Sequence, residues 1–227
     1  MTHHALLYCL KTFFPGFDFT FAGTEMEEAL SKELDFMHEA NNSERAAAKL
    51  TVKNVYIPKV YHKLTSKRVL TCEFIDGCKI TDVERIKEMG FSIKDVTKSM
   101  LEAFSEQIFV SGFVHADPHP GNVFVRKNPL SPKNYQVVIL DHGLYRELDE
   151  ELRITWCHLW KAMIEKDNSK IEYYGEQMGV SKDKADLLPG MILMRAHNDS
   201  TRVGLGAGMT DKEMKEIAGN PFIYSIF

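Results

Sequence analysis

The segment His115-Ala-Asp-Pro-His-Pro-Gly-Asn122 constrains the fold of this chain more than any other feature. Pro118 and Pro120 fix their backbone φ angles and have no N–H to donate, so neither a helix nor a central strand continues through the segment. An amphipathic helical pattern precedes it. The apolar runs Val123–Val125 and Tyr135–Leu140 follow it, with a loop rich in Pro, Asn and Ser between them. The sequence therefore predicts a rigid turn between a helix and a β-hairpin.

Three oxygen-bearing side chains lie at the ends of this predicted hairpin. Asn122 follows Asp117 by five residues, and Asp141 follows Asn122 by nineteen, at the end of the second strand. Such oxygen ligands suit Mg²⁺ beside a polyphosphate. Phosphoryl transfer uses one Asp near the accepting hydroxyl, with an Asn and a second Asp on the metal. The spacing matches the kinase loop H-R-D-L-x-x-x-N, with Ala116 in place of the Arg, and His142 replaces the Phe of Asp-Phe-Gly.

Acidic residues mark a predicted helix near the start of the chain. Thr24 followed by Glu27 forms a capping-box pattern, and helical periodicity extends from about Glu25 to Leu50. Glu33 falls near the middle of the apolar stripe formed by Met26, Ala29, Leu30, Met37 and Ala40, whereas Asp35 and Glu39 share the opposite side. Glu33 is either a carboxylate that reaches solvent at the edge of the stripe or a buried acid that needs a cationic partner.

The remaining pattern predicts an α+β chain. Strand-like runs cover Val55–Tyr61 and Arg68–Ile75, and Ser92 caps a helix that ends at Gly112. After Gly143 the pattern is mostly helical. Trp156 and Trp160, four residues apart, fit core packing better than a ligand platform.

Composition excludes several classes of protein. Lys and Arg number 28 against 32 Asp and Glu, so the net charge of −4 provides no electrostatic footprint for nucleic acid or anionic membrane. No stretch approaches the roughly 18 apolar residues of a membrane span. The four cysteines have no metal-binding spacing and fit reduced thiols. A soluble globular protein is expected.

The motifs resemble those of the UbiB family of atypical kinases, also called aarF-domain kinases, and in particular the mitochondrial members. The family's acidic motif, E-x-D followed by E-A, matches Glu33–Asn41. Its catalytic loop matches His115–Asn122, and its metal motif matches Asp141–Leu144. The resemblance extends from about residue 20 to residue 180.

This resemblance implies a protein-kinase-like fold that binds ATP with Mg²⁺. Residues 1–75 would form a partial amino-terminal lobe, containing the acidic helix and two strands, and residues 76–227 a helical carboxy-terminal lobe. Asp117 would be the catalytic-loop aspartate, with His115 and His119 in the same catalytic set. His119 either touches the transferring phosphate or is a structural imidazole bonded to the loop backbone.

The resemblance also implies the contacts with nucleotide and metal. Asn122 and Asp141 would bind the metal, and the backbone of Glu73 and Ile75 would meet adenine. Within the acidic motif, which also includes Asp35, either Glu33 or Glu39 would pair with a strand lysine that grips the phosphates; periodicity favours Glu33.

The chain departs from the family at its amino terminus. Only 23 residues precede Thr24, and Lys11, their sole lysine, follows no glycine-rich or alanine-rich turn. We therefore expect a chain truncated at its amino terminus, without the nucleotide loop and the strand lysine.

The sequence after the metal motif bears on the phosphoryl acceptor, and the resemblance bears on the cellular location of the protein. No Ser occurs between Gly143 and Ser169, and no Thr before Thr155, so a long phosphorylated activation loop is absent and peptide docking is disfavoured. A lipid or quinone-related small molecule, or simple ATP hydrolysis, fits better. Characterised relatives imply a role in coenzyme Q biosynthesis or lipid homeostasis and a mitochondrial location.

Three other interpretations remain open. A metal-dependent hydrolase would use the alternating His115, Asp117 and His119, with His142 as a fourth ligand. A small-molecule phosphotransferase of the aminoglycoside- or choline-kinase type shares the catalytic loop. A non-catalytic, pseudokinase-like binding fragment fits the missing lobe.

Overall fold

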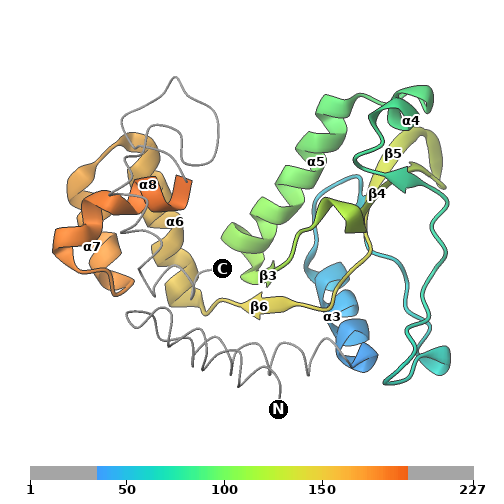
Figure 1. The fold of residues 1–227 in the computed structure, drawn as a ribbon, viewed down its shortest axis with the longest axis horizontal. Coiled ribbons are helices and arrows are strands. Elements are labelled where there is room, and N and C mark those ends of the chain that lie inside the picture. The colour runs from blue at the N-terminus through green and yellow to red at the C-terminus, as the bar shows by residue number, and fades with distance from the viewer. Residues whose placement is uncertain (1–34, 194–227) are drawn as a thin grey trace, which may run out of the picture. The chain divides into compact units, whose positions relative to one another are not determined.

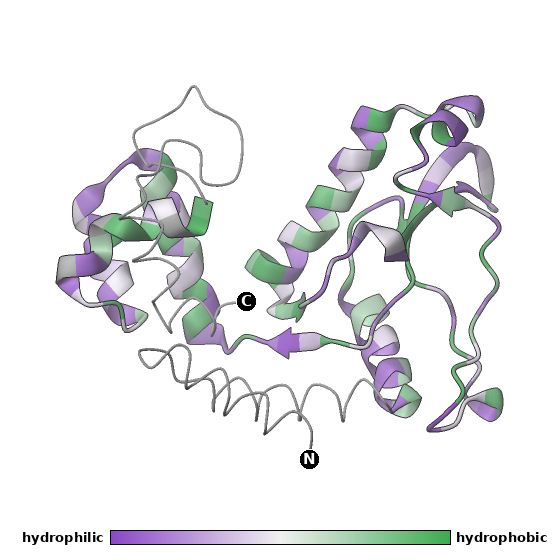
Figure 2. Ribbon diagram, in the orientation of Figure 1, coloured by the Kyte–Doolittle hydropathy of each residue, from purple (hydrophilic) through white to green (hydrophobic). Residues whose placement is uncertain are grey.

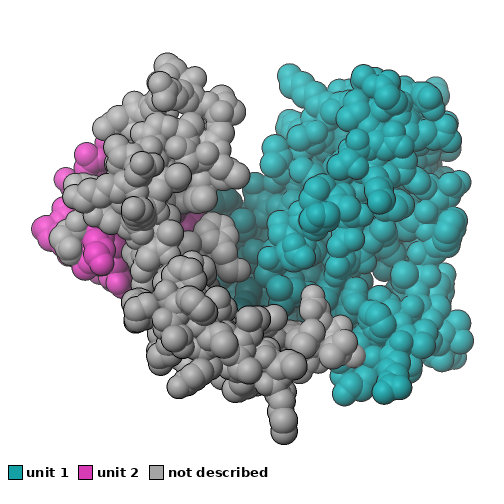
Figure 3. Space-filling view, viewed as in Figure 1, with its two compact units in different colours: residues 1–148 teal, residues 149–227 magenta. Residues whose placement is uncertain are grey.

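The structure is a computed structural model that describes residues 35–193. The chain forms two compact units, residues 1–148 and 149–227, coloured teal and magenta in Figure 3. The predicted lobe boundary at residues 75–76 falls inside the first unit and stays a prediction.

The described part of the first unit mixes short strands with helices (Figure 1). In chain order its elements are α3 (Phe36–Lys49), β1 (Val55–Tyr56), the 3₁₀ helix η1 (His62–Leu64), β2 (Cys78–Lys79), α4 (Val83–Glu88), α5 (Ile93–Glu106), the π-helix η2 (Gln107–Ser111), β3 (Phe113–His115), the 3₁₀ helix η3 (Pro120–Asn122), β4 (Val123–Asn128), β5 (Ser131–Ile139) and β6 (Tyr145–Glu147).

A four-stranded sheet in the order β1-β5-β4-β2 forms the core of this unit. β4 and β5 pair as the antiparallel hairpin that the sequence predicted, with Val123 opposite Ile139, whereas β1 lies parallel to β5. Val123, Val125 and Val137 are buried against α4 and α5 through Ile86 and Val96. The hairpin thereby places Asn122, just before β4, next to Leu140, just after β5: the Leu140 N–H donates to the Asn122 carbonyl at 2.9 Å.

Helix α5 starts where the sequence predicted and ends in a different geometry. Ser92 Oγ accepts from the N–H of Asp95 at 3.3 Å, which confirms the predicted cap. The last turn widens into the π-helix η2, and Gly112 then takes φ = 64°, a left-handed conformation that favours glycine. The chain thus leaves α5 directly into β3.

Two predicted strands are wrong. The first shrinks to β1, and between the two runs the described residues show isolated bridges, Val60 with Cys72 and Ser66 with Val69. A strand needs a continuous ladder of backbone hydrogen bonds. β1 forms its ladder with β5 instead of with the second run, so the second run remains extended without becoming a regular strand.

The acidic helix differs from the prediction in its start and in its buried face. Asp35 is an N-cap whose Oδ1 accepts from the N–H of Met37 at 3.0 Å, so α3 begins at Phe36 instead of continuing through Asp35. The buried positions of α3 are Ala40, Asn42, Ser43 and Ala46, and Met37 is exposed. Figure 2 shows the middle of α3 mainly in purple and white, whereas α5 carries repeated green turns. A buried face made of small and polar residues has no clear apolar stripe. The earlier part of the predicted helix, including Glu33, lies outside the described residues.

The described part of the second unit is a small helical cluster. It contains α6 (Glu150–Glu165), α7 (Asn168–Gln177), η4 (Lys182–Leu187) and α8 (Leu188–Leu193). Leu159, Met163 and Ile171 form its core, and Trp156 and Trp160 pack against them with their rings edge to face at 6.3 Å. The predicted packing role of the tryptophan pair is confirmed. Within residues 35–193, no helix combines the length and hydropathy needed to cross a bilayer.

Two histidines are buried inside the first unit. His142 is 1% exposed, and its Nε2 lies 3.0 Å from the Ile139 carbonyl, which can only accept, so Nε2 carries the proton. Its Nδ1 accepts from the Tyr145 hydroxyl at 3.0 Å. Burial raises the pKa of Tyr145, which keeps this hydroxyl a donor. Burial also lowers the pKa of His142 to about 4, with the neighbouring His115 acting in the same direction. The interior therefore holds His142 as a neutral imidazole.

The native state should lose stability in acid because of His142. The unfolded chain takes up this proton below its ordinary pKa of 6.5, whereas the folded chain resists it until about pH 4. The stability is therefore complete above pH 6.5 and falls by about 3 kcal/mol as the pH drops to 4. Urea unfolding of the metal-free chain at several pH values measures this loss. His142→Phe should flatten the slope relative to wild type; parallel curves for wild type and His142→Phe would refute the assignment.

Candidate functional site

The loop at residues 116–122 is held in shape by its own histidine and glycine. His119 Nδ1 accepts from the N–H of Gly121 at 3.0 Å, and the His119 carbonyl accepts from the N–H of Asn122 at 3.0 Å. A Cβ on Gly121 would lie 2.8 Å from His119 Nδ1, so a larger residue here would displace the His119 ring. Of the two roles left open for His119, the structural bond to the loop backbone is present. Its exposed ring leaves the phosphate contact as a proposal.

His115 joins the two aspartate segments. Its Nδ1 accepts from the N–H of Asp117 at 3.1 Å, and its Nε2 donates to the Asp141 carbonyl at 3.0 Å. The residue is 4% exposed, and burial lowers the pKa of its imidazole, so the ring is neutral. Both nitrogens of His115 are thus bonded to the backbone of the two aspartate segments, and its predicted catalytic part stays a prediction. Asp117 itself lies on the exposed part of the loop.

Asn122 and Asp141 lie together, as the sequence predicted. Asn122 Nδ2 donates to Asp141 Oδ2 at 2.8 Å, and the N–H of Gly143 donates to Asp141 Oδ1 at 2.9 Å. With its amide nitrogen bonded to Asp141, Asn122 has only Oδ1 as a metal ligand. An amide oxygen beside a carboxylate is a donor set that suits Mg²⁺.

Helix α3 brings Glu39 to the same place. Glu39 Oε1 accepts from the N–H of His142 at 3.2 Å. Burial raises the pKa of Glu39, and the nearby Asp141 carboxylate raises it further. The predicted position of Glu39, on the side away from the interior, is therefore wrong, because α3 buries a face made of small and polar residues. A carboxyl group whose pKa is raised beside a second carboxylate fits a site that a divalent cation would stabilise.

Asp35 lies apart from this group in the described structure. As the N-cap of α3 it is bonded to the helix backbone, and its carboxylate lies 3.9 Å from Lys67 Nζ. Its contacts are those of a helix cap, and its predicted part in nucleotide binding stays a prediction.

The predicted adenine-binding segment is tied to the sheet through Glu73. The N–H of Glu73 donates to the Lys59 carbonyl at 2.8 Å, and the predicted adenine contact of this segment stays a prediction. Arg126 Nη1 donates to Glu73 Oε1 at 2.9 Å, and the Tyr56 hydroxyl donates to Glu73 Oε2. Burial alone would raise the pKa of Glu73, but these two hydrogen bonds lower it, so the carboxylate is charged. Ile75, the other predicted contact, is buried.

Sequence reasoning missed three buried polar residues that hold this site. Asn42 Nδ2 donates to the His142 carbonyl at 3.0 Å, and Gln107 Oε1 accepts from the N–H of His115 at 2.9 Å. Arg126, with 7% of its side chain exposed, is the third. An arginine directly after the apolar run Val123–Val125 was a usable signal. Asn42 and Gln107 carried none, since an amide on a helix is ordinarily exposed.

The structure does not support the metal-hydrolase interpretation. Both ring nitrogens of His115 and of His142 are bonded inside the protein. Within residues 35–193, no cluster of three or more His, Cys, Asp or Glu side chains is arranged to hold a metal ion. Zinc would need ligands that these histidines do not offer.

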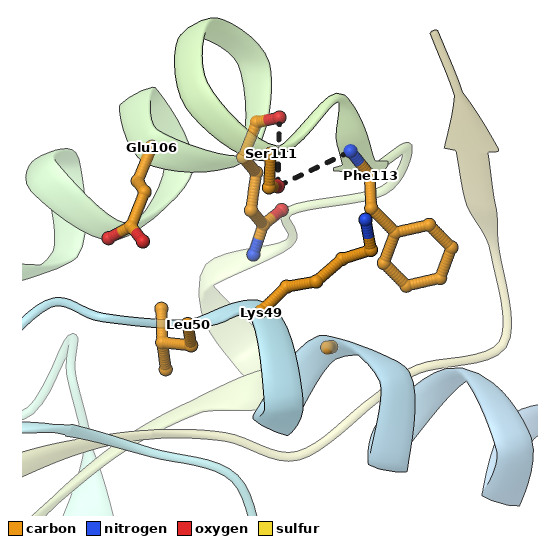
Figure 4. A pocket seen from close by; sticks show the side chains of 7 residues that line it. Lys49, Leu50, Glu106, Ser111 and Phe113 are labelled. Atoms are coloured by element: carbon orange, nitrogen blue, oxygen red, sulfur yellow. Dashed lines mark hydrogen bonds between the residues drawn. The ribbon is translucent and has the colours of Figure 1, made fainter. Parts of the chain in front are cut away.

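A separate small hollow lies between the end of α3 and η2 (Figure 4). Lys49, Leu50, Glu106, Ser111 and Phe113 are among its lining residues, and its accessible volume is about 10 Å³. That volume is the room of a single water molecule. This hollow is therefore not a nucleotide site.

Comparisons with known proteins agree with this geometry. Residues 1–174 match the family described as ABC1 atypical kinase-like domain. The chain is 47% identical over 217 residues to the probable serine/threonine-protein kinase abkD of Dictyostelium discoideum, covering 95% of this chain and 31% of that protein. It is 37% identical over 223 residues to AarF domain-containing protein kinase 1 of Mus musculus, covering 96% of this chain and 42% of that protein. The chain thus spans less than half the length of these curated relatives.

A solved structure shares the fold. The Rv3197–erythromycin complex from Mycobacterium tuberculosis matches with a TM-score of 0.54 and 22% identity, covering 99% of this chain and 61% of that one. The mixed helix-and-strand, kinase-like fold expected from the sequence is confirmed. With a family model that matches residues 1–174 and relatives aligned along most of its length, the chain belongs to the ABC1 atypical kinase family, which includes the AarF domain-containing kinases.

Proposed function

We propose that this chain carries the catalytic loop and metal ligands for Mg²⁺-dependent cleavage of ATP. The observation that supports this most is the 2.8 Å contact between Asn122 and Asp141, with Asp117 held by His115 in the same loop. Phosphoryl transfer depends mainly on positioning and on stabilising charge, and these three residues supply the oxygen groups for both.

Each residue has a distinct part in this proposal. Asn122 Oδ1 and the Asp141 carboxylate would hold Mg²⁺, which, when bound, neutralises the developing charge on the phosphate oxygens. Asp117 orients the attacking hydroxyl or water and accepts its proton. The Glu73 carbonyl and the Ile75 N–H bind adenine. Of the acids that the structure describes, Glu39 lies beside Asp141, so it would pair with the family's phosphate-gripping lysine, which we do not expect in this chain.

A short connection after the metal motif supports a non-peptide acceptor. The N–H of Ala116 donates to the Leu144 carbonyl at 3.0 Å, β6 pairs with β3 at once, and α6 already begins at Glu150. A peptide-docking activation segment has no residues to form it here. We therefore propose a lipid or quinone-related small molecule as acceptor, or water, with a role in coenzyme Q or lipid homeostasis in mitochondria.

Two alternatives predict different behaviour. A pseudokinase-like fragment would use the same fold for binding only. An aminoglycoside- or choline-kinase-like enzyme would phosphorylate an amino sugar or an amino alcohol. The name of the Dictyostelium relative suggests a third acceptor, serine or threonine in a protein.

Removing either aspartate should abolish ATP cleavage. Single-turnover hydrolysis with Mg-ATP should slow by about 100-fold or more in Asp117→Asn and in Asp141→Asn, because the first loses the proton acceptor and the second a metal ligand. Glu84→Gln, at an exposed position on α4, is the matched control and should keep the wild-type rate. Equal rates in all four proteins would leave the binding fragment as the better description.

The fate of the γ-phosphate separates the acceptors. Radiolabelled ATP should yield inorganic phosphate or a phosphorylated lipid or quinone-related molecule, because no peptide-docking segment follows Gly143. Thin-layer chromatography measures these products, and gel autoradiography with casein measures protein phosphorylation. Asp117→Asn serves as the background control. Label in casein that depends on Asp117 would contradict the proposed acceptor class, as would label in choline or an aminoglycoside.

A further inference from the structure

We propose that Asn42 is a positioning residue that sets the orientation of the Asp141 carboxylate. The inference rests on the proposed function only in taking Asp141 as the metal ligand. The geometry on which it stands lies entirely within the first unit.

The amide of Asn42 holds one end of a peptide group, and Asp141 holds the other. Asn42 Nδ2 donates to the His142 carbonyl at 3.0 Å. The N–H of Gly143 belongs to the same planar peptide unit and donates to Asp141 Oδ1 at 2.9 Å. A rotation of this peptide would therefore break both hydrogen bonds together. Asn42 thus acts on Asp141 through one rigid group.

The preceding peptide group is held in the same way. Its carbonyl, that of Asp141, accepts from His115 Nε2 at 3.0 Å. Its N–H, that of His142, donates to Glu39 Oε1 at 3.2 Å. Glu39 and Asn42 are three residues apart on α3 and so lie on one face of that helix. Two adjacent peptide groups of the metal motif are therefore held on one side by Glu39 and Asn42 of α3. On the other side they are held by His115 and by the Asp141 carboxylate.

Burial makes the contact of Asn42 specific. The residue is 3% exposed, and its bond to the His142 carbonyl is a buried one. A buried carbonyl that loses its donor is left unsatisfied, which is costly. An alanine or leucine at this helix position would avoid the cost of burying an amide. The buried amide of Asn42 therefore indicates a specific hydrogen-bond partner rather than packing alone.

The next turn of α3 prevents the helix from moving away. Arg45 Nη2 donates to both carboxylate oxygens of Glu147 at 2.9 and 2.8 Å, and its guanidinium lies 4.3 Å from the centre of the Phe113 ring. Glu39, Asn42 and Arg45 follow residues 142 to 147 along one side of the helix. Glu39 and Asn42 thus bind α3 to the metal motif and Arg45 binds it to β6, with Asn42 as the buried central contact.

Replacement of Asn42 should release the 142–143 peptide and weaken metal binding. Asn42→Leu removes the donor at similar size, and Asn42→Asp removes it with almost no change of shape. In the metal-free chain, both should speed amide hydrogen exchange at Gly143 by about 10-fold or more, as measured by NMR. Binding of Mn²⁺ in the presence of a non-hydrolysable ATP analogue, measured by electron paramagnetic resonance, should weaken by about 10-fold, at the low end for residues that support metal ligands.

Ser43→Ala is the matched control, because Ser43 is a buried polar neighbour on the same helix. It should leave Gly143 exchange and Mn²⁺ affinity within twofold of wild type. If Asn42→Leu lowers the melting temperature while both readouts stay at wild-type values, Asn42 is merely structural and the proposal is overturned. Unchanged readouts in Asn42→Asp overturn it equally, and this variant decides if the leucine variant fails to fold. If wild type binds no Mn²⁺ with nucleotide but Gly143 exchange still depends on Asn42, the positioning role stands and the proposed function fails.

Discussion

The hydrogen bond from His115 Nε2 to the Asp141 carbonyl is the contact on which the rest of the site depends. It joins a loop that follows β3 to a turn that follows β5, two segments separated by 26 residues. Because the other nitrogen of the same ring accepts from the backbone of Asp117, one neutral imidazole sets the distance between the two aspartate segments. A charged imidazole has no acceptor nitrogen, and it would break one of these bonds. Burial, which holds the ring neutral, is thus part of how the site is built.

Buried amides extend this arrangement beyond the loop. Asn122 bonds the Asp141 carboxylate, and Asn42 bonds the His142 carbonyl. Gln107 bonds the N–H of His115. Each amide comes from a different element, so η3, α3 and η2 all converge on the same few residues. The π-helix η2 helps to place Gln107 next to His115, because widening the helix after α5 changes which side chain faces β3. Polar networks of this kind are favourable only when every member is satisfied, which makes the site rigid.

The segment that follows the metal motif is short. The metal motif, β6 and α6 follow one another within ten residues, and β6 is used to pair with β3 beside the catalytic loop. That pairing lines His115 up with Tyr145, whose hydroxyl in turn bonds His142. The backbone after the motif therefore completes the interior of the site, and this is the physical basis for proposing an acceptor other than a peptide.

The sequence alone was sufficient for the features that depend on local chemistry. Two prolines and a glycine predicted the rigid loop, alternating apolar runs predicted the hairpin, and the hairpin predicted that Asn122 and Asp141 would meet. Ser92 marked a helix start because a cap acts on residues three positions away. All of these interactions lie close along the chain or across one hairpin, so residue spacing specifies them.

The tertiary structure decided the remainder, since it depends on which groups meet when the chain folds, in two cases across about a hundred residues. The apolar period of the acidic helix placed Glu39 outside, yet its bond to His142, 103 residues away, turns it inward. Asn42 and Gln107 resembled ordinary surface amides until their partners, the carbonyl of His142 and the N–H of His115, were in view. The run Arg68–Ile75 had the composition of a strand, but β1 took its ladder partner from β5. The periodicity of a sequence shows which face of a helix is apolar. The positions of Glu39, Asn42 and Gln107 depend instead on which backbone groups need a hydrogen-bond partner in the folded chain.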